Sequence, residues 1–219
     1  YMCSFKTPVE GSYYGSYISK LYKNKQILDT LTPDPMLPVH TAWDLGMDDA
    51  TTIWFIQIFK NEIRVVNYYE NSGEGLPHYA RELNRYATQR DIVYGKHYAP
   101  HDIKVRELGT GKSPLEIARS MGLKFTTVKK LPIIDGIDAV RAILPRCWFA
   151  KNDCARGLEA LKGYHKEYDS SRGVFRKSPV HDSSSHGADA FRTLAVGMKQ
   201  PKLDNKKPKT TYDVAAVRW

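Results

Sequence analysis

The chain has 219 residues, of which 42% are hydrophobic and 26% charged, and it carries a formal net charge of +9. This length fits one large domain with a sizeable core, and the positive charge favours a polyanionic partner, nucleic acid before an anionic membrane. The composition excludes a membrane-spanning class, because no run approaches the roughly 18 apolar residues that a transmembrane helix needs.

The first segment, residues 1–38, is rich in Tyr, Gly, Ser and Pro. Its spaced prolines, Pro33, Pro35 and Pro38, predict a stiff and extended approach to the first strand. Inside this linker-like segment, apolar residues at helical spacing predict a helix over residues 13–28.

Next come three runs rich in β-branched and aromatic residues, with gaps short enough for an antiparallel meander. These predicted strands cover residues 39–44, 51–59 and 62–70. The middle and last runs are joined at Lys60-Asn61, which has the composition of a turn.

After the meander, strands and helices alternate. The predicted helices cover residues 76–89, 115–121, 135–144, 154–164 and 183–198, and the predicted strands cover residues 92–98, 125–129 and 147–149. Asp135 stands where the third of these helices would have its N-cap. A β-hairpin is expected over residues 164–176. The order predicts an α/β fold, with a mixed sheet flanked by helices and an extra β-hairpin.

Three aspartates lie far apart in the chain, each beside an apolar element. Asp44 precedes a strand, Asp102 follows one, and Asp189 lies in the last predicted helix. A charged group beside apolar residues must be solvated, paired or bound to metal. A single loop Asp is more often a turn residue or a cap, so the hypothesis depends on all three together. Clustered carboxylates are the ligands that Mg²⁺ or Mn²⁺ prefers, and two ions held in this way cleave phosphodiesters.

Two further polar residues precede Asp189 at helical spacing. Asp182 and His186 are four residues apart, and His186 is three residues before Asp189, so one helical face could hold all three. Asp182 is either an additional metal ligand or the N-cap of the helix. His186 either assists proton transfer to the leaving oxygen or is a packing histidine.

A Gly-rich run, Gly109-Thr110-Gly111-Lys112-Ser113, resembles a nucleotide-binding P-loop but fails its pattern. The motif needs a Gly five residues before Gly111, and Arg106 stands there. We therefore expect no ATPase activity. Lys112 either contacts a DNA phosphate or belongs to a simple turn.

Basic side chains gather at two other places. Arg172 and Arg176 lie in the predicted hairpin, where they either clamp DNA or protect an exposed edge. Lys206 and Lys207 belong to a predicted flexible basic tail, residues 199–219, which either binds DNA or is a solvated terminus.

Several of these stretches resemble the nuclease domain of the large terminase subunit of tailed double-stranded DNA phages. The matching stretches are Trp43-Asp44-Leu45-Gly46, Tyr98-Ala99-Pro100-His101-Asp102, Gly109 to Ser113, Asp135 to Arg141 and His186 to Arg192. The likeness covers roughly residues 1–197. It implies a ribonuclease H-like fold with acidic residues from the first strand, a central strand and a late helix, which correspond to Asp44, Asp102 and Asp189.

The resemblance also implies a function. The expected activity is a Mg²⁺- or Mn²⁺-dependent endonuclease, with two ions, that cuts concatemeric viral DNA when genome packaging begins and ends. Expected partners are double-stranded DNA, an ATPase domain of the same polypeptide, the small terminase subunit and the portal, with no membrane. The nuclease domain would cover residues 39–198 and work in the host cytoplasm at the procapsid portal. This location agrees with Cys3, Cys147 and Cys154, which include no C-x-x-C pair and are expected to be reduced thiols without zinc.

Two alternatives remain open at this point. Another ribonuclease H-like nuclease, of the junction resolvase or transposase type, would use the same carboxylates. A non-catalytic DNA-binding packaging module would use the basic surface without the metal site.

Overall fold

The structure, a computed structural model, describes residues 10–46, 49–106 and 111–199. Its centre is a seven-stranded mixed sheet in the order β1-β7-β4-β3-β2-β5-β6, and a separate two-stranded sheet is formed by β8 and β9. The strands are β1 (Ile27–Leu28), β2 (Val39–Asp44), β3 (Ala50–Phe59), β4 (Glu62–Ser72), β5 (Tyr94–Ala99), β6 (Phe125–Thr127), β7 (Cys147–Ala150), β8 (Lys166–Asp169) and β9 (Val174–Pro179).

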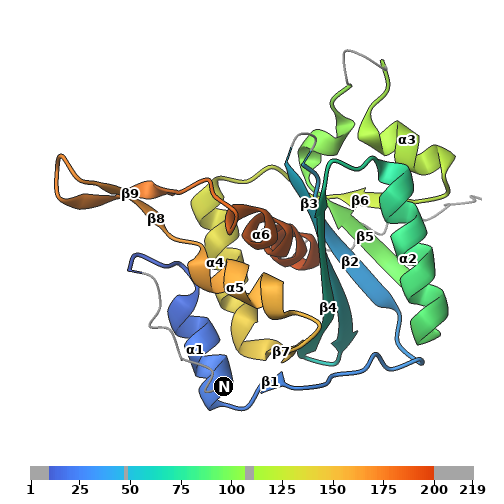
Figure 1. Ribbon diagram of the computed structural model, residues 1–219, viewed down its shortest axis with the longest axis horizontal. Coiled ribbons are helices and arrows are strands. Elements are labelled where there is room, and N and C mark those ends of the chain that lie inside the picture. Colours follow the sequence, from blue (N-terminus) through green and yellow to red (C-terminus); the bar gives the residue numbers. More distant parts are fainter. Residues whose placement is uncertain (1–9, 47–48, 107–110, 200–219) are drawn as a thin grey trace, which may run out of the picture.

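The helices lie on both faces of this sheet (Figure 1). They are α1 (Gly15–Lys23), α2 (Leu76–Arg90), α3 (Pro114–Ser120), α4 (Ile133–Ile143), α5 (Ala155–Gly163) and α6 (Ser185–Lys199), with short 3-10 turns at His101–Lys104 and Leu144–Arg146. The predicted mixed α/β sheet with flanking helices and an extra hairpin is confirmed.

Alternation along β2 and β3 divides the core between the two faces. Trp43 and Phe55 belong to a cluster packed under α2, whereas Trp54 and Ile56 belong to the larger cluster under α4, α5 and α6. Successive side chains of a strand point to opposite faces, so a run buried on both sides reads as continuously apolar. Helix α6 lies across β2 and β3 between α4 and α5 (Figure 1).

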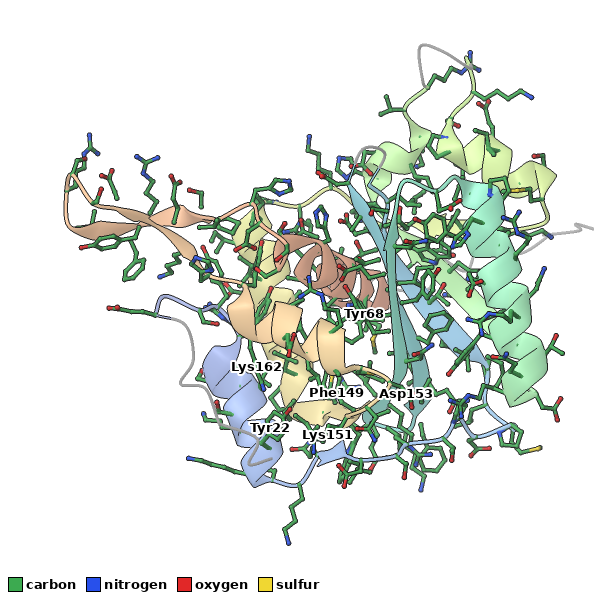
Figure 2. The ribbon with its side chains drawn as sticks, in the orientation of Figure 1. Tyr22, Tyr68, Phe149, Lys151, Asp153 and Lys162 are labelled. Atoms are coloured by element: carbon green, nitrogen blue, oxygen red, sulfur yellow. The ribbon has the colours of Figure 1, made fainter. Side chains whose placement is uncertain are left out.

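The described part of the N-terminal segment packs on the domain. Tyr14, the N-cap of α1, and Ile18 within α1 are fully buried in the larger core cluster, and Lys162 of α5 lies 4.5 Å from the ring centre of Tyr22 (Figure 2). The predicted helix over residues 13–28 is wrong at its end. Lys25 takes a left-handed φ of 56°, after which β1 pairs in parallel with β7. The assignment of residues 1–38 to a linker stays a prediction.

A second correction concerns the start of α4. Its N-cap is Pro132, without a side-chain cap, and Asp135 lies inside the first turn. A carboxylate there interacts favourably with the positive end of the helix dipole, but it does not cap a backbone N–H. The hairpin is formed as expected, with a turn at residues 170–173, and it extends away from the body of the molecule (Figure 1).

Candidate metal-dependent nuclease site

The carboxyl ends of two neighbouring parallel strands place the first two aspartates. Strand β2 ends at Asp44, and β5 ends at Ala99, just before the 3-10 turn that contains Asp102. The strands pair in parallel with Ala42 opposite Tyr98. Parallel neighbours end at the same edge of a sheet, which is where ligands bind in α/β folds. Asp44 and Asp102 therefore share one edge.

Hydrogen bonds to β3 fix the first turns of α6 over the same edge. The Thr52 hydroxyl donates to the carbonyl of His186 at 2.9 Å, and the Trp54 indole N–H donates to the carbonyl of Gly187 at 2.8 Å. Gly187 also lets α6 lie close to α5 and β4, because a Cβ there would lie 2.8 Å from the Cβ of Ala160 and 2.9 Å from the Tyr68 hydroxyl. These contacts fix the position of Asp189, which follows within the next turn.

All three aspartates line one cavity of about 170 Å³. Asp44 and Asp189 are about a quarter exposed, at 25% and 27%, and Asp102 is exposed. The sequence expectation that residues 44, 102 and 189 meet in space is thus matched by the fold. Their roles as metal ligands and catalytic groups stay predictions.

Basic side chains that the sequence reasoning missed line the same cavity, namely Lys129, Lys130 and Arg192, and His101 lies there too. Arg192 had a local signal, because it stands three residues after Asp189 on one helix. Lys129 and Lys130 follow β6, and only the parallel pairing of β6 with β5 brings them to this edge.

Asp189 is held by two partners. The Arg192 Nη1 lies 2.9 Å from its Oδ1, and the Tyr164 hydroxyl donates to the same oxygen at 3.4 Å. Burial raises the pKa of Asp189 to about 6; Arg192 opposes this shift and the carboxylate of Asp44 adds to it. Two carboxylates that lie close together and away from water repel each other, and a bound cation removes this repulsion.

His186 contacts the first aspartate. Its Nδ1 lies 3.4 Å from Oδ2 of Asp44, and this contact, more than the opposing effect of burial, raises the pKa of His186. The histidine therefore contacts the site through Asp44, and its proton-transfer role stays a prediction.

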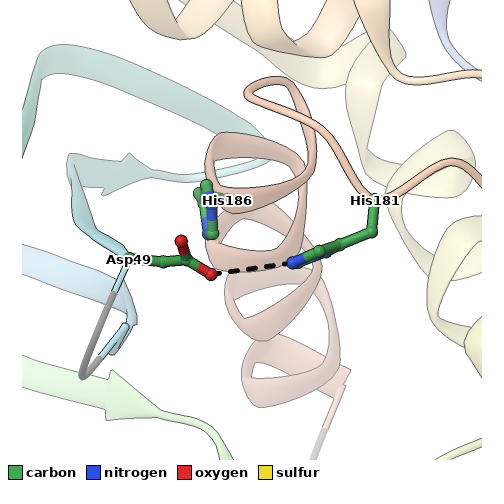
Figure 3. Close-up of side chains that lie close together, drawn as sticks. All are labelled: Asp49, His181 and His186. Atoms are coloured by element: carbon green, nitrogen blue, oxygen red, sulfur yellow. Dashed lines mark ion pairs between the residues drawn. The ribbon is translucent and has the colours of Figure 1, made fainter.

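His186 also belongs to a cluster of possible metal ligands that the sequence did not reveal. One ligand atom each of Asp49, His181 and His186 lies within 4.8 Å of the other two (Figure 3). His181 Nε2 is 3.7 Å from Asp49 Oδ2. From the sequence, Asp49 reads as a turn residue, and no local pattern connects it with a histidine 132 positions later.

Asp182 lies just ahead of α6 and bonds to a residue of the turn that precedes the helix. Its Oδ1 accepts hydrogen bonds from the backbone N–H of Ser184 at 2.8 Å and from the Ser184 hydroxyl at 2.5 Å. It does not line the cavity of the three aspartates. These bonds stabilise the turn that leads into α6, and the roles of Asp182 as a cap or as a metal ligand both stay predictions.

The predicted DNA-binding residues are scattered. Lys112 and Arg172 are exposed, and Arg176 is paired inside the hairpin with Asp169 at 3.1 Å and Glu167 at 3.2 Å. Lys206 and Lys207 lie outside the described residues. Ser113 is used as the N-cap of α3 in a capping box with Glu116, so this end of the Gly-rich run starts a seven-residue helix.

Known proteins resemble the chain in structure and not detectably in sequence. No family model and no curated protein matches the sequence. The large terminase of a thermophilic bacteriophage matches with a TM-score of 0.61 and 16% identity, over 84% of this chain and 45% of that one. The chain thus spans less than half the length of this protein.

Isolated nuclease domains match over most of both chains. The nuclease domain of the P22 large terminase has a TM-score of 0.55 and 17% identity, over 78% of this chain and 87% of that one. The large terminase nuclease of phage G20c with bound cobalt has a TM-score of 0.53 and 16% identity, over 84% and 98%. The nuclease domain of the SPP1 large terminase, solved with bound Mn, has a TM-score of 0.52 and 14% identity, over 71% and 84%. The chain therefore has the ribonuclease H-like fold of large terminase nuclease domains.

Proposed function

We propose that this chain is a metal-dependent DNA endonuclease that cuts concatemeric viral DNA when packaging starts and stops. The observation that carries the proposal is the single cavity lined by Asp44, Asp102 and Asp189, three carboxylates that come from β2, the turn after β5 and helix α6. The metal-bound terminase nucleases of similar fold support it.

The donor set fits a hard divalent cation. Carboxylate oxygens suit Mg²⁺ and Mn²⁺, and the desolvated carboxylate of Asp189 beside Asp44 is a charge arrangement that a cation stabilises. We propose that Asp44, Asp102 and Asp189 hold two such ions, which would activate the attacking water and stabilise the leaving 3′ oxygen.

The protein's own side chains would bind and orient the DNA. Lys129 and Lys130 line the cavity and would pair with phosphates next to the scissile bond. His186, in contact with Asp44, would move a proton near the leaving oxygen. Such backbone contacts carry no sequence information, so little sequence preference is expected.

We propose further partners from the resemblance to the full-length large terminase, of which this chain spans 45%. Residues 1–38 would connect to an ATPase domain, and residues 199–219 would form a basic tail on the DNA. The small terminase subunit and the portal would complete the packaging assembly in the host cytoplasm. No helix among the described residues is both long and apolar enough to cross a membrane.

Replacing each aspartate by asparagine tests the proposal. Asp44→Asn, Asp102→Asn and Asp189→Asn should each abolish plasmid cleavage in Mn²⁺, because each removes an anionic oxygen ligand while keeping the side-chain volume. The matched control is Asp29→Asn, an exposed aspartate that pairs with Lys151; it should cut like the wild type. Full activity of any of the three would remove that residue from the site.

A resolvase or transposase would depend on the same three aspartates, so these variants do not separate it from a terminase nuclease. A non-catalytic DNA-binding module would bind DNA and show no cleavage in any variant. The cavity with three carboxylates favours the enzyme over that module.

A further inference from the structure

We propose that Arg192 and Tyr164 are positioning residues that orient the carboxylate of Asp189 for metal binding. The inference rests on the proposed function, since it concerns the same metal site. It assigns a role to two residues on different elements, Arg192 within α6 and Tyr164 just after α5.

The first step is the geometry around a single oxygen. Arg192 Nη1 is 2.9 Å from Asp189 Oδ1, the Tyr164 hydroxyl is 3.4 Å from the same atom, and Arg192 Nη1 is 3.4 Å from that hydroxyl. The three groups form a closed triangle of polar contacts. Because both partners bind Oδ1, they restrict rotation of the carboxylate and leave Oδ2 for a ligand in the cavity.

The second step is that both partners are fixed by their own surroundings. Tyr164 is 1% exposed and stacks on Tyr14, the N-cap of α1, with ring centres 5.7 Å apart and an interplanar angle of 18°. Its backbone carbonyl also accepts from the N–H of Tyr13 at 2.9 Å. A ring held in this way can place its hydroxyl reproducibly.

Arg192 is fixed from the other side by a glycine of α4. A Cβ at Gly136 would overlap Cδ of Arg192 and lie 2.6 Å from its Cγ. The aliphatic stem therefore crosses α4 where no side chain stands, and the guanidinium reaches back to Asp189. This contact gives a physical reason for the glycine within the stretch Asp135 to Arg141, which the cavity chemistry alone does not explain.

Side chains that hydrogen-bond to the ligands of a metal strengthen its binding considerably. Changing such a partner costs about 10–100-fold in metal affinity or activity, because the ligand loses its orientation. The variant Arg192→Lys keeps the positive charge and loses the planar fork that fits a carboxylate. The variant Tyr164→Phe keeps the stacked ring and removes the hydroxyl.

The test is isothermal titration calorimetry, in which Mn²⁺ alone is titrated into the whole chain and its affinity is measured. Arg192→Lys and Tyr164→Phe should each weaken Mn²⁺ binding about tenfold or more, and high Mn²⁺ should restore much of the cleavage rate. Their thermal unfolding in chelator should stay near that of the wild type. Gly136→Ala, which displaces the arginine stem, should weaken Mn²⁺ binding in the same direction.

The matched control is Tyr14→Phe. The Tyr14 hydroxyl is buried and has no hydrogen-bond partner among the described residues, so its removal keeps the stack and should leave Mn²⁺ affinity unchanged. Wild-type affinity in both Arg192→Lys and Tyr164→Phe would overturn the inference and leave the proposed nuclease standing, as would an equal loss in Tyr14→Phe. A wild-type chain that binds no Mn²⁺ would overturn the metal site itself, and the inference with it.

Discussion

Asp189 is the residue in which the demands of folding and of the proposed chemistry conflict. Burial and the neighbouring carboxylate of Asp44 favour its neutral form, and Arg192 only partly opposes them, so its pKa lies near 6. At neutral pH the residue is nonetheless ionised in most molecules. Without a cation, the folded state therefore carries an electrostatic cost at this position, which the unfolded chain does not have.

We therefore predict that Asp189→Asn stabilises the metal-free protein at pH 7.5. In the wild type, the pKa of Asp189 is higher in the folded state than in the unfolded chain, so the folded protein binds a proton there more tightly. This proton binding stabilises the fold fully below pH 3.8, and the contribution is lost as pH rises through 6. Asparagine carries no such dependence. The gain at pH 7.5 should reach roughly 3 kcal/mol. Urea unfolding in chelator at pH 4 and 7.5 measures it, and a variant less stable than the wild type at pH 7.5 would refute it.

A second buried titratable group lies behind the site, on β5. The Trp43 indole N–H donates to Oγ1 of Thr41 at 2.6 Å, and the same oxygen lies 2.7 Å from Nδ1 of His97. Burial lowers its pKa to about 4, with a smaller effect from His40.

For His97 the pH dependence has the opposite sign. Between pH 4 and 6.5 the unfolded chain binds a proton that folded His97 does not, so the wild type loses stability as pH falls through this window. His97→Asn keeps an acceptor for Thr41 but does not titrate. The stability difference, wild type minus variant, should shrink by roughly 3 kcal/mol between pH 7 and pH 4. A difference that stays constant across these pH values would show that His97 is not a buried neutral base.

The aspartates could be predicted from sequence at residue scale, and their surroundings could not. Asp44 and Asp102 stand at strand ends, and the edge where parallel strands end is fixed by topology. Asp49 and His181 come from two different connections, and only the tertiary fold brings them together. Arg192 was within reach of helical spacing, but an arginine beside an aspartate also reads as an ordinary surface ion pair.

At the scale of elements, the start of α6 depends on Asp182. Its contacts with Ser184 are those of an Asx-turn that leads into the helix, and we expect them to act as a cap does. Asp182→Asn should therefore leave both stability and the Mn²⁺ midpoint for cleavage nearly unchanged, because Asn and Asp cap about equally well. Asp182→Ala should lose roughly 0.5–2 kcal/mol of stability. A large rise of the Mn²⁺ midpoint in Asp182→Asn, with an unaltered melting curve, would identify a ligand instead.

Long elements and most short ones, such as β6 and β7, were predictable from the sequence, whereas the shortest strand, β1, was missed. The meander β2–β3–β4 and helices α2 and α6 follow directly from strand and helix periodicity. The two-residue strand β1 is too short to show any periodicity, so the helix predicted over residues 13–28 wrongly included its two apolar residues. What ends that helix is the left-handed φ of Lys25, and lysine gives no sequence signal for this conformation.

At the scale of the whole molecule, the sheet order brings distant parts of the sequence into one site. Strands β2 and β5 are neighbours although β3, β4 and α2 intervene in the chain, and α6 returns across β2 and β3 near the end of the described residues. The net charge of +9 on the whole chain favours the approach of DNA. The mixed sheet could be predicted from the alternation of strands and helices, whereas the order of the strands in the sheet became known only from the structure.

The most direct test of the central claim is cleavage of supercoiled plasmid by the isolated chain without any nucleotide. We predict cutting with Mg²⁺ or Mn²⁺, complete loss in chelator, and recovery when the metal is restored in excess. The reason is that, in the proposed mechanism, the carboxylates of Asp44, Asp102 and Asp189 would supply anionic ligands and the metal would supply the reactivity. Cleavage that persists in chelator, or its absence in both metals while DNA is bound, would contradict the account.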